Sequence, residues 1–235
     1  MGGSTPKALL PVGDHEPLLF YLLAGLKKVG VDDLIVVTGY KPQEIQNFVT
    51  ENWGDATYVF NARYASWGNF HSLRMGLDQS PGFDVLSVNS DIVIHPGALQ
   101  RVIATRGDLV LAVQQRYGLD QEDMRVRLQG NRVRAIGKDL LMRQSQGEFC
   151  GVSLLRPEAA RAYLDISSTW EWAARTQVYY EDVFAEMLDR VDTRAATVNE
   201  GEYAEVDVPD DMRFADAVIE QHADVWASEP APEPV

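Results

Sequence analysis

The run Leu34-Ile35-Val36-Val37, closed by Gly39, has the continuous apolar pattern of a β-strand that is buried on both faces. Helices are predicted on either side of this run, over His15–Val29 with Asp14 as the N-cap and over Pro42–Asn52. Alternating helices and strands at short spacing indicate a doubly wound α/β fold built on a parallel sheet.

The alternation continues along the first half of the chain, with strands at Thr57–Phe60 and Val85–Val88 around a helix at Phe70–Leu77. The second half predicts an antiparallel extension, because apolar runs follow one another without helices between them. Its expected strands are Leu109–Val113, Met124–Leu128, Val133–Ile136 and Gly147–Leu154, with a turn at Gly130-Asn131. Expected after them are helices at Pro157–Asp165 and about 180–190, a strand near 194–198 and a helix over about 209–225.

These elements predict one α/β domain over residues 1–227, Rossmann-like, with a mixed, mainly parallel sheet and a small antiparallel extension. Residues 228–235 alternate proline with small or acidic residues, and this composition predicts a disordered tail.

Composition excludes several classes of protein. The chain has 235 residues and a formal net charge of −14, which argues against nucleic-acid binding. Cys150 is the single cysteine, so no internal disulfide forms and a reducing compartment is expected. No apolar run approaches the roughly 18–20 residues of a membrane span, and we find no signal peptide. We therefore expect a cytoplasmic protein with no membrane or nucleic-acid partner.

Two aspartates have the positions of metal ligands. Asp91 stands just past the predicted strand Val85–Val88, and ligands bind at the carboxyl ends of strands in open α/β sheets. Asp207 ends the short segment Tyr203-Ala204-Glu205-Val206-Asp207 and precedes Pro209, which could start a helix. The alternative for both is a cap on the next turn or helix. Together they suit Mg²⁺, which takes one or two carboxylates plus phosphate oxygens and waters.

Two lysines are candidates for phosphate binding. Lys7 lies in a turn after Pro6, from which a lysine can reach triphosphate oxygens as a point charge. A solvated surface lysine is the alternative. Lys138 follows a predicted strand and Gly137, and it could hold the phosphate of an acceptor substrate.

Two further segments carry polar or aromatic groups suited to small ligands. Asn69 to Ser72 opens a helix and could offer hydrogen bonds to a base edge, with Asn69 as a simple N-cap the alternative. The segment Tyr179-Tyr180-Glu181-Asp182, with Trp170 and Trp172 upstream, could form a cage for a quaternary ammonium. The alternative there is core packing, with acidic residues placed in a first helical turn by the helix dipole.

In their order and spacing, these segments resemble the cytidylyltransferase branch of the sugar-nucleotide nucleotidyltransferase (pyrophosphorylase) family. The matching pieces extend from Pro6 to about Ile219. They include Pro6-Lys7-Ala8-Leu9, Val37-Thr38-Gly39-Tyr40, Asn61-Ala62-Arg63-Tyr64, Asn69-Phe70-His71-Ser72-Leu73, Ser90-Asp91, Ile136-Gly137-Lys138 and Glu205-Val206-Asp207. The resemblance implies the nucleotide-diphospho-sugar transferase type of fold.

The resemblance also implies roles for single residues. Lys7 would bind the triphosphate, Asp91 and Asp207 would bind Mg²⁺, and Asn69 and Ser72 would lie near the base. From its own position in the sequence, we expect Lys138 to join Lys7 in catalysis and to hold the acceptor. The acceptor would also contact Tyr179, Tyr180 and Glu181. Apart from the resemblance, we also consider a homodimer, although the sequence does not determine the oligomeric state.

The sequence departs from the family pattern at two places. The family has a buried strand and a Gly-rich loop ending in Arg before the lysine, whereas only Gly2-Gly3-Ser4 represents that loop here. We therefore expect the N-terminal strand and most of the loop to be missing. Three explanations are considered: a shortened chain, a stretch left out of the sequence, and a relative that has lost its activity. Choline-specific members are expected to carry an aromatic residue near Met124, so Met124 beside Arg125 leaves room for another phosphorylated substrate.

The predicted activity is transfer of a nucleoside monophosphate from a nucleoside triphosphate to a small phosphorylated acceptor, with release of pyrophosphate. CTP is the preferred donor, and phosphocholine or an aminoalkyl phosphonate is a preferred type of acceptor. The alternatives are a sugar-1-phosphate nucleotidyltransferase using UTP, GTP or dTTP, and a non-catalytic nucleotide-binding homologue. A glycosyltransferase is disfavoured because Asn89-Ser90-Asp91 stands where those enzymes usually show Asp-x-Asp.

Overall fold

The computed structural model describes residues 5–116, 118–172 and 175–226. Its helices are η1 (Lys7–Leu9), α1 (Leu18–Lys28), α2 (Pro42–Asn52), α3 (Phe70–Asp78), α4 (Pro96–Ala104), η2 (Met142–Gln144), α5 (Pro157–Trp172), α6 (Tyr180–Met187), η3 (Pro209–Asp211), α7 (Met212–Gln221) and α8 (Ala223–Trp226). Its strands are β1 (Ile35–Thr38), β2 (Thr57–Phe60), β3 (Val85–Val88), β4 (Ile92–Ile94), β5 (Leu109–Gln114), β6 (Arg125–Gln129), β7 (Arg132–Ile136), β8 (Gly147–Leu155), β9 (Thr193–Val198) and β10 (Tyr203–Glu205). Within these ranges, no helix is long and apolar enough to cross a membrane.

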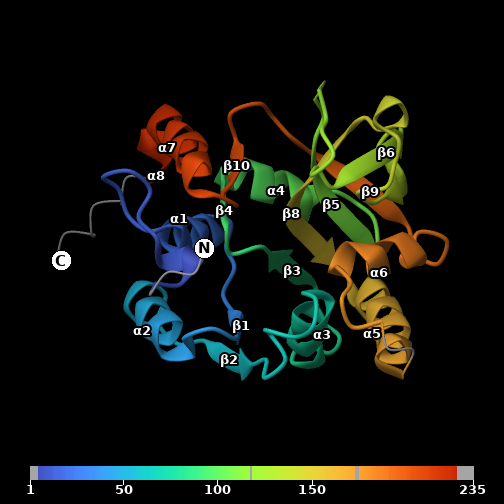
Figure 1. Cartoon of the computed structure of the whole chain (residues 1–235), viewed down its shortest axis with the longest axis horizontal. Helices are drawn as coiled ribbons and strands as arrows, with labels where there is room; N and C mark the ends of the chain where they lie inside the picture. The colour runs from blue at the N-terminus through green and yellow to red at the C-terminus, as the bar shows by residue number, and fades with distance from the viewer. Residues whose placement is uncertain (1–4, 117, 173–174, 227–235) are drawn as a thin grey trace.

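The strands form one sheet of six, in the order β3-β8-β5-β9-β7-β6, and two separate pairs, β1–β2 and β10–β4 (Figure 1). The β1–β2 and β5–β9 pairings are parallel, and the other pairings are antiparallel. The predicted α/β class with a mixed sheet is confirmed. The antiparallel share is larger than expected, because β8 lies between β3 and β5 and runs antiparallel to both.

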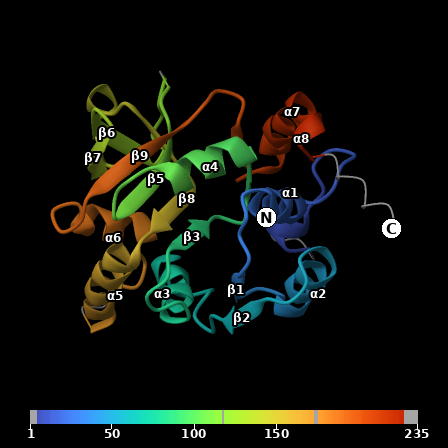
Figure 2. The same cartoon turned by 180° about the vertical axis from the view of Figure 1, so that it is seen from behind.

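Helices cover both faces of the large sheet, and the alternation along β5 shows why. Leu109, Leu111 and Val113 pack into one apolar cluster with α3, α5 and α6. Val110 and Ala112 point the other way, into a cluster with α1 and α4. Side chains alternate between the two faces of a strand, so an unbroken apolar run is buried on both sides. Figure 2 shows α4 lying across β5 and β8 on one of these faces.

The start of the first long helix differs from the prediction. α1 begins at Leu18 with Pro17 in the N-cap position, so Asp14 is not its cap. Pro17 has no N–H, and the Leu18 N–H donates to the carbonyl of Leu10, so the preceding residues form a loop that folds back on itself. At the far end of the chain, the single predicted helix is divided into η3, α7 and α8, with a break at His222.

The strands β1 and β3 are less buried than their apolar sequences predict. All four residues of β3 and the first three of β1 are only partly buried. In the part of the chain that the structure describes, β1 pairs only with β2 and β3 only with β8. Each strand therefore has one edge without a neighbour there, which accounts for the difference. The predicted disordered tail, 228–235, lies outside the described residues.

Candidate active site

The two predicted metal ligands lie side by side. Asp91 stands between β3 and β4, and β10 pairs antiparallel with β4, so that Glu205 lies opposite Ile92. The N–H of Val206 then donates to the carbonyl of Asp91 at 2.9 Å. This pairing brings Asp207 beside Asp91, although more than a hundred residues separate them in the sequence.

Lys7 joins the two aspartates. Its Nζ lies 3.0 Å from Asp91 Oδ2 and 3.0 Å from Asp207 Oδ1, and its side chain is 29% exposed. Burial disfavours the charged amine, but the two carboxylates outweigh that effect and raise the pKa of Lys7 above its ordinary value. The ammonium is therefore fixed as a charged group at the end of the β3–β4 segment.

Glu205 is a third acidic group that the sequence analysis did not assign to the site. Ligand oxygens of Asp91, Glu205 and Asp207 all lie within 4.8 Å of one another. Burial raises the pKa of Glu205 to about 7, and the charges of Asp91 and Asp207 add to the shift. Its Oε2 accepts a hydrogen bond from the Tyr203 hydroxyl at 3.0 Å. The spacing Glu205-Val206-Asp207 was the available signal, because residues two apart along a strand share a face.

This carboxylate group fits Mg²⁺. Oxygen donors are the ligands that Mg²⁺ takes, and opposite ligands of an octahedral ion lie about 4 Å apart. Ligand oxygens of the three carboxylates lie within 4.8 Å of one another, and a cation, the Lys7 ammonium, lies against two of the carboxylates. The donor set and the stand-in cation both agree with a divalent metal site at Asp91 and Asp207.

Asn69 and Ser72 are held by hydrogen bonds within the protein. Asn69 is not a side-chain cap for α3; its Oδ1 accepts from the N–H of Tyr180 at 3.0 Å and so caps α6 instead. Ser72 Oγ accepts from Asn61 Nδ2 at 2.9 Å. Asn61 is buried and was missed as a site residue, although its segment was noted. The proximity of Asn69 and Ser72 to a base stays a prediction.

Tyr180 and Glu181 face inward. The Tyr180 hydroxyl donates to Asn89 Oδ1 at 2.9 Å, two residues before Asp91 in the chain. Glu181 is 6% exposed, and its Oε2 has no hydrogen-bond partner among the described atoms. Burial raises the pKa of Glu181 to about 7. Both residues are thus buried and do not lie on an open surface.

An aromatic cage that includes Trp170 does not form near these residues. Trp170 is buried, with its ring 5.7 Å from that of Phe70, so its place is in the core. The side chain of Trp172 lies outside the described part of the structure. Tyr179 is exposed, and the Nζ of Lys138 lies 5.6 Å from its ring centroid. The core-packing alternative is therefore correct for Trp170.

Lys138 and Arg125 line an open hollow beside Tyr179. Its other lining residues are Gln121, Asp139, Leu140, Leu141, Met142 and Arg143. Arg125 is buried and donates to the carbonyl oxygens of Leu140 and Asp120. Among the described residues no carboxylate pairs with Arg125, whereas Lys138 has a 3.4 Å contact with exposed Glu122. The hollow therefore has a basic wall, suited to an anionic group.

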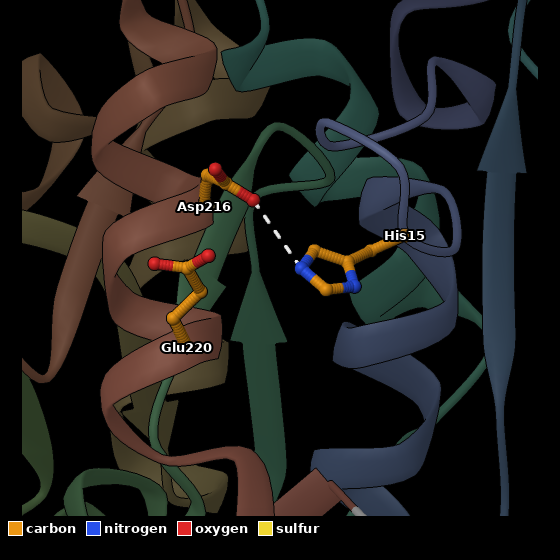
Figure 3. A group of neighbouring side chains, drawn as sticks. All are labelled: His15, Asp216 and Glu220. Atoms are coloured by element: carbon orange, nitrogen blue, oxygen red, sulfur yellow. Dashed lines mark ion pairs between the residues drawn. The ribbon is translucent and has the colours of Figure 1, made fainter.

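A second group of possible metal ligands lies elsewhere. Figure 3 shows His15, from the loop before α1, facing Asp216 and Glu220 on α7. His15 Nε2 lies 3.4 Å from Asp216 Oδ1, and the side chains of His15 and Glu220 are exposed. Exposed acidic groups with a histidine are common on protein surfaces, so we assign no ligand to this group.

The lysine and the acidic side chains gather just after β3 and β10, and ligands of open α/β sheets bind outside the carboxyl ends of strands. Residues 1–163 match the model of the MobA-like NTP transferase domain, and the chain belongs to this family. It is thus a member of a nucleotidyltransferase family, as the sequence resemblance predicted.

Individual relatives agree with this family. The chain is 38% identical over 73 residues to the choline-phosphate cytidylyltransferase of Streptococcus pneumoniae, covering 31% of each protein. It is 26% identical over 121 residues to the D-glycero-alpha-D-manno-heptose 1-phosphate guanylyltransferase of Aneurinibacillus thermoaerophilus, covering 48% of this chain and 52% of the relative. The matches thus span about half or less of these relatives. The fold is similar to that of the inositol-1-phosphate CTP transferase from T. maritima, with a TM-score of 0.78, 19% identity and coverage of 94% and 90%.

Proposed function

We propose that the protein transfers CMP from CTP to a small phosphorylated acceptor and releases pyrophosphate, with Mg²⁺ as the metal cofactor. The observation that carries this proposal is the meeting of Lys7 with Asp91 and Asp207 at 3.0 Å. The lysine would hold triphosphate oxygens, and the aspartates would hold Mg²⁺. When bound, this ion would neutralise charge on the triphosphate.

The reaction needs no covalent intermediate on the protein. A phosphate oxygen of the acceptor attacks the α-phosphorus of the nucleotide, a new P–O bond forms, and the bond from the α-phosphorus to the bridging oxygen of pyrophosphate breaks. Charge spreads over the phosphate oxygens as this happens. A fixed ammonium such as that of Lys7 stabilises this charge, because it is already oriented before the reaction starts.

Two of the comparisons support CTP as the donor, since the choline-phosphate and inositol-1-phosphate relatives are named for cytidylyl or CTP transfer. The heptose 1-phosphate guanylyltransferase supports a second candidate, transfer to a sugar-1-phosphate from another nucleotide. The acceptor would enter beside Tyr179, where Lys138 and Arg125 offer cationic groups to its phosphate. The phosphate group of a zwitterionic phosphate ester or phosphonate suits this basic wall.

A panel of substrates tests the proposal. We expect pyrophosphate release with CTP and phosphocholine or an aminoalkyl phosphonate, and slower release with UTP, GTP or dTTP. Pyrophosphate is measured for each triphosphate against amino-alcohol phosphates, phosphonates and hexose-1-phosphates. Turnover of hexose-1-phosphates alone would establish the second candidate. Binding of CTP without pyrophosphate release from any acceptor would instead indicate a non-catalytic nucleotide-binding protein.

Lys138 is expected to act on the acceptor and not on the nucleotide. We predict that Lys138→Gln raises the KM for the acceptor at least tenfold, because a hydrogen bond to a charged group contributes about 1.5–3 kcal/mol. The KM for CTP should stay within about twofold, since the side chain lies at the hollow beside Tyr179. Initial rates at saturating CTP measure the first constant, and rates at saturating acceptor measure the second.

Lys28→Gln is the matched control for this substitution. Lys28 is exposed on α1, and its replacement changes the net charge of the protein by the same amount as Lys138→Gln. A rise in the KM for CTP equal to that for the acceptor would place Lys138 on the triphosphate instead.

A further inference from the structure

The Lys7 ammonium occupies the place that a divalent cation would need. Its Nζ makes two contacts of 3.0 Å, one with a carboxylate oxygen of each predicted metal ligand. Glu205 completes a cluster whose ligand oxygens lie within 4.8 Å of one another. The cluster thus gathers three acidic groups, and two of them contact Lys7.

An ammonium and a divalent ion cannot share this position. A Mg²⁺ ion binds carboxylate oxygens at about 2.0–2.1 Å, so an ion bridging Asp91 and Asp207 would sit where the ammonium now makes its hydrogen bonds. Two cations so close together repel strongly, and partial burial weakens the screening by water. One of the two must leave when the other is bound.

We infer that Lys7 and the divalent cation are alternative occupants of the Asp91–Asp207 site, and that binding of the cation releases Lys7 toward the triphosphate. The first half of this inference concerns the protein and metal alone. The second half rests on the proposed function. In the absence of metal, Lys7 offsets part of the negative charge of the acidic cluster; in the loaded state, the same side chain is free to reach phosphate oxygens.

If the inference is correct, removing the charge of Lys7 has opposite effects on two affinities, one for the metal alone and one for the nucleotide with its metal. Removing its charge should strengthen binding of the metal alone, because no hydrogen bonds to Lys7 have to be broken. The same change should weaken binding of the nucleotide with its metal, because a phosphate contact is lost. A lysine that only binds phosphate would show the second effect without the first.

The test is titration of the purified protein with Mn²⁺ in the absence of nucleotide, with free Mn²⁺ followed by its EPR signal. We expect Lys7→Met to raise the Mn²⁺ affinity about tenfold, equivalent to about 1.4 kcal/mol. Lys28→Met, which removes one exposed charge at the end of α1, controls for net charge and should change the affinity little. Lys7→Arg keeps a cation and should not reproduce the gain. Melting curves without metal establish that each variant is folded.

Two further measurements complete the test. Adding Asp91→Asn to Lys7→Met should abolish the gain, which assigns the Mn²⁺ to this cluster. With a non-hydrolysable CTP analogue and Mg²⁺, Lys7→Met should bind the nucleotide more weakly than the parent protein. An unchanged or lower Mn²⁺ affinity in Lys7→Met would overturn the inference. Because no turnover is measured, this result is distinct from failure of the substrate panel.

Discussion

Replacing Asp91 by Asn is expected to lower kcat about a thousandfold, in line with the loss of a group that stabilises transition-state charge. The amide keeps the size of the side chain but removes a negative charge from the group that would hold Mg²⁺. It also removes one of the two carboxylates that contact Lys7. Asp207→Asn should act in the same direction, because its carboxylate has the same two functions. Pyrophosphate release at saturating CTP and acceptor measures kcat.

The same substitutions should leave the folded state nearly as stable as before. The Lys7–Asp91 and Lys7–Asp207 pairs are partly exposed, with Asp207 72% exposed, and such pairs contribute about 0–1 kcal/mol. Asp210→Asn is the matched control, because Asp210 is exposed close to Asp207 in the chain. Near-normal turnover in either the Asp91 or the Asp207 variant would show that the metal assignment is wrong.

The fold was predictable where the signal is local. The predicted bounds of Thr57–Phe60 and Val85–Val88 agree with β2 and β3, because short apolar runs between turn residues specify strands. The pairing of the three-residue strands β4 and β10 was not predictable in this way. It joins Ile92 to Glu205 across more than a hundred residues, and no local pattern encodes such a contact.

The candidate site also has a part that local sequence signals predict and a part that depends on long-range contacts. Lys7, Asp91 and Asp207 were selected by residue type and by position after a turn or strand, and the structure brings them together. Their contact depends on the long-range β4–β10 pairing. The inward orientation of Tyr180 was beyond the sequence as well, because α6 packs against α3 and α5 through tertiary contacts that decide which face is buried.

Glu181 makes the stability of the protein depend on pH in a defined direction. Burial raises its pKa in the folded protein from 4.5 to about 7. Below pH 4.5 both folded and unfolded states hold the proton, and the contribution of this group to stability is fully present. As pH rises from 4.5 to about 7, the unfolded chain releases the proton first, so the free energy of unfolding falls. A shift of this size corresponds to about 3 kcal/mol.

Glu181→Gln should therefore match the parent protein near pH 4.5 and exceed it at pH 8 by about 3 kcal/mol. Glutamine keeps the shape of the protonated acid and does not titrate. Urea unfolding at both pH values measures the difference. Glu205 also has a pKa raised to about 7, but it is present in both proteins, so its effect cancels in the comparison.

Glu200→Gln supplies the control for Glu181→Gln, because Glu200 is an exposed carboxylate whose removal should change stability little at either pH. If the free energies of unfolding of Glu181→Gln and the parent differ by the same amount at both pH values, Glu181 is not held protonated by burial. A difference in the free energy of unfolding that is found only at high pH would show that the folded protein contains a destabilising buried acid. A buried acid with one oxygen that lacks a hydrogen bond, on the helix whose Tyr180 contacts Asn89, is expected where binding of a ligand rather than stability determines the residue.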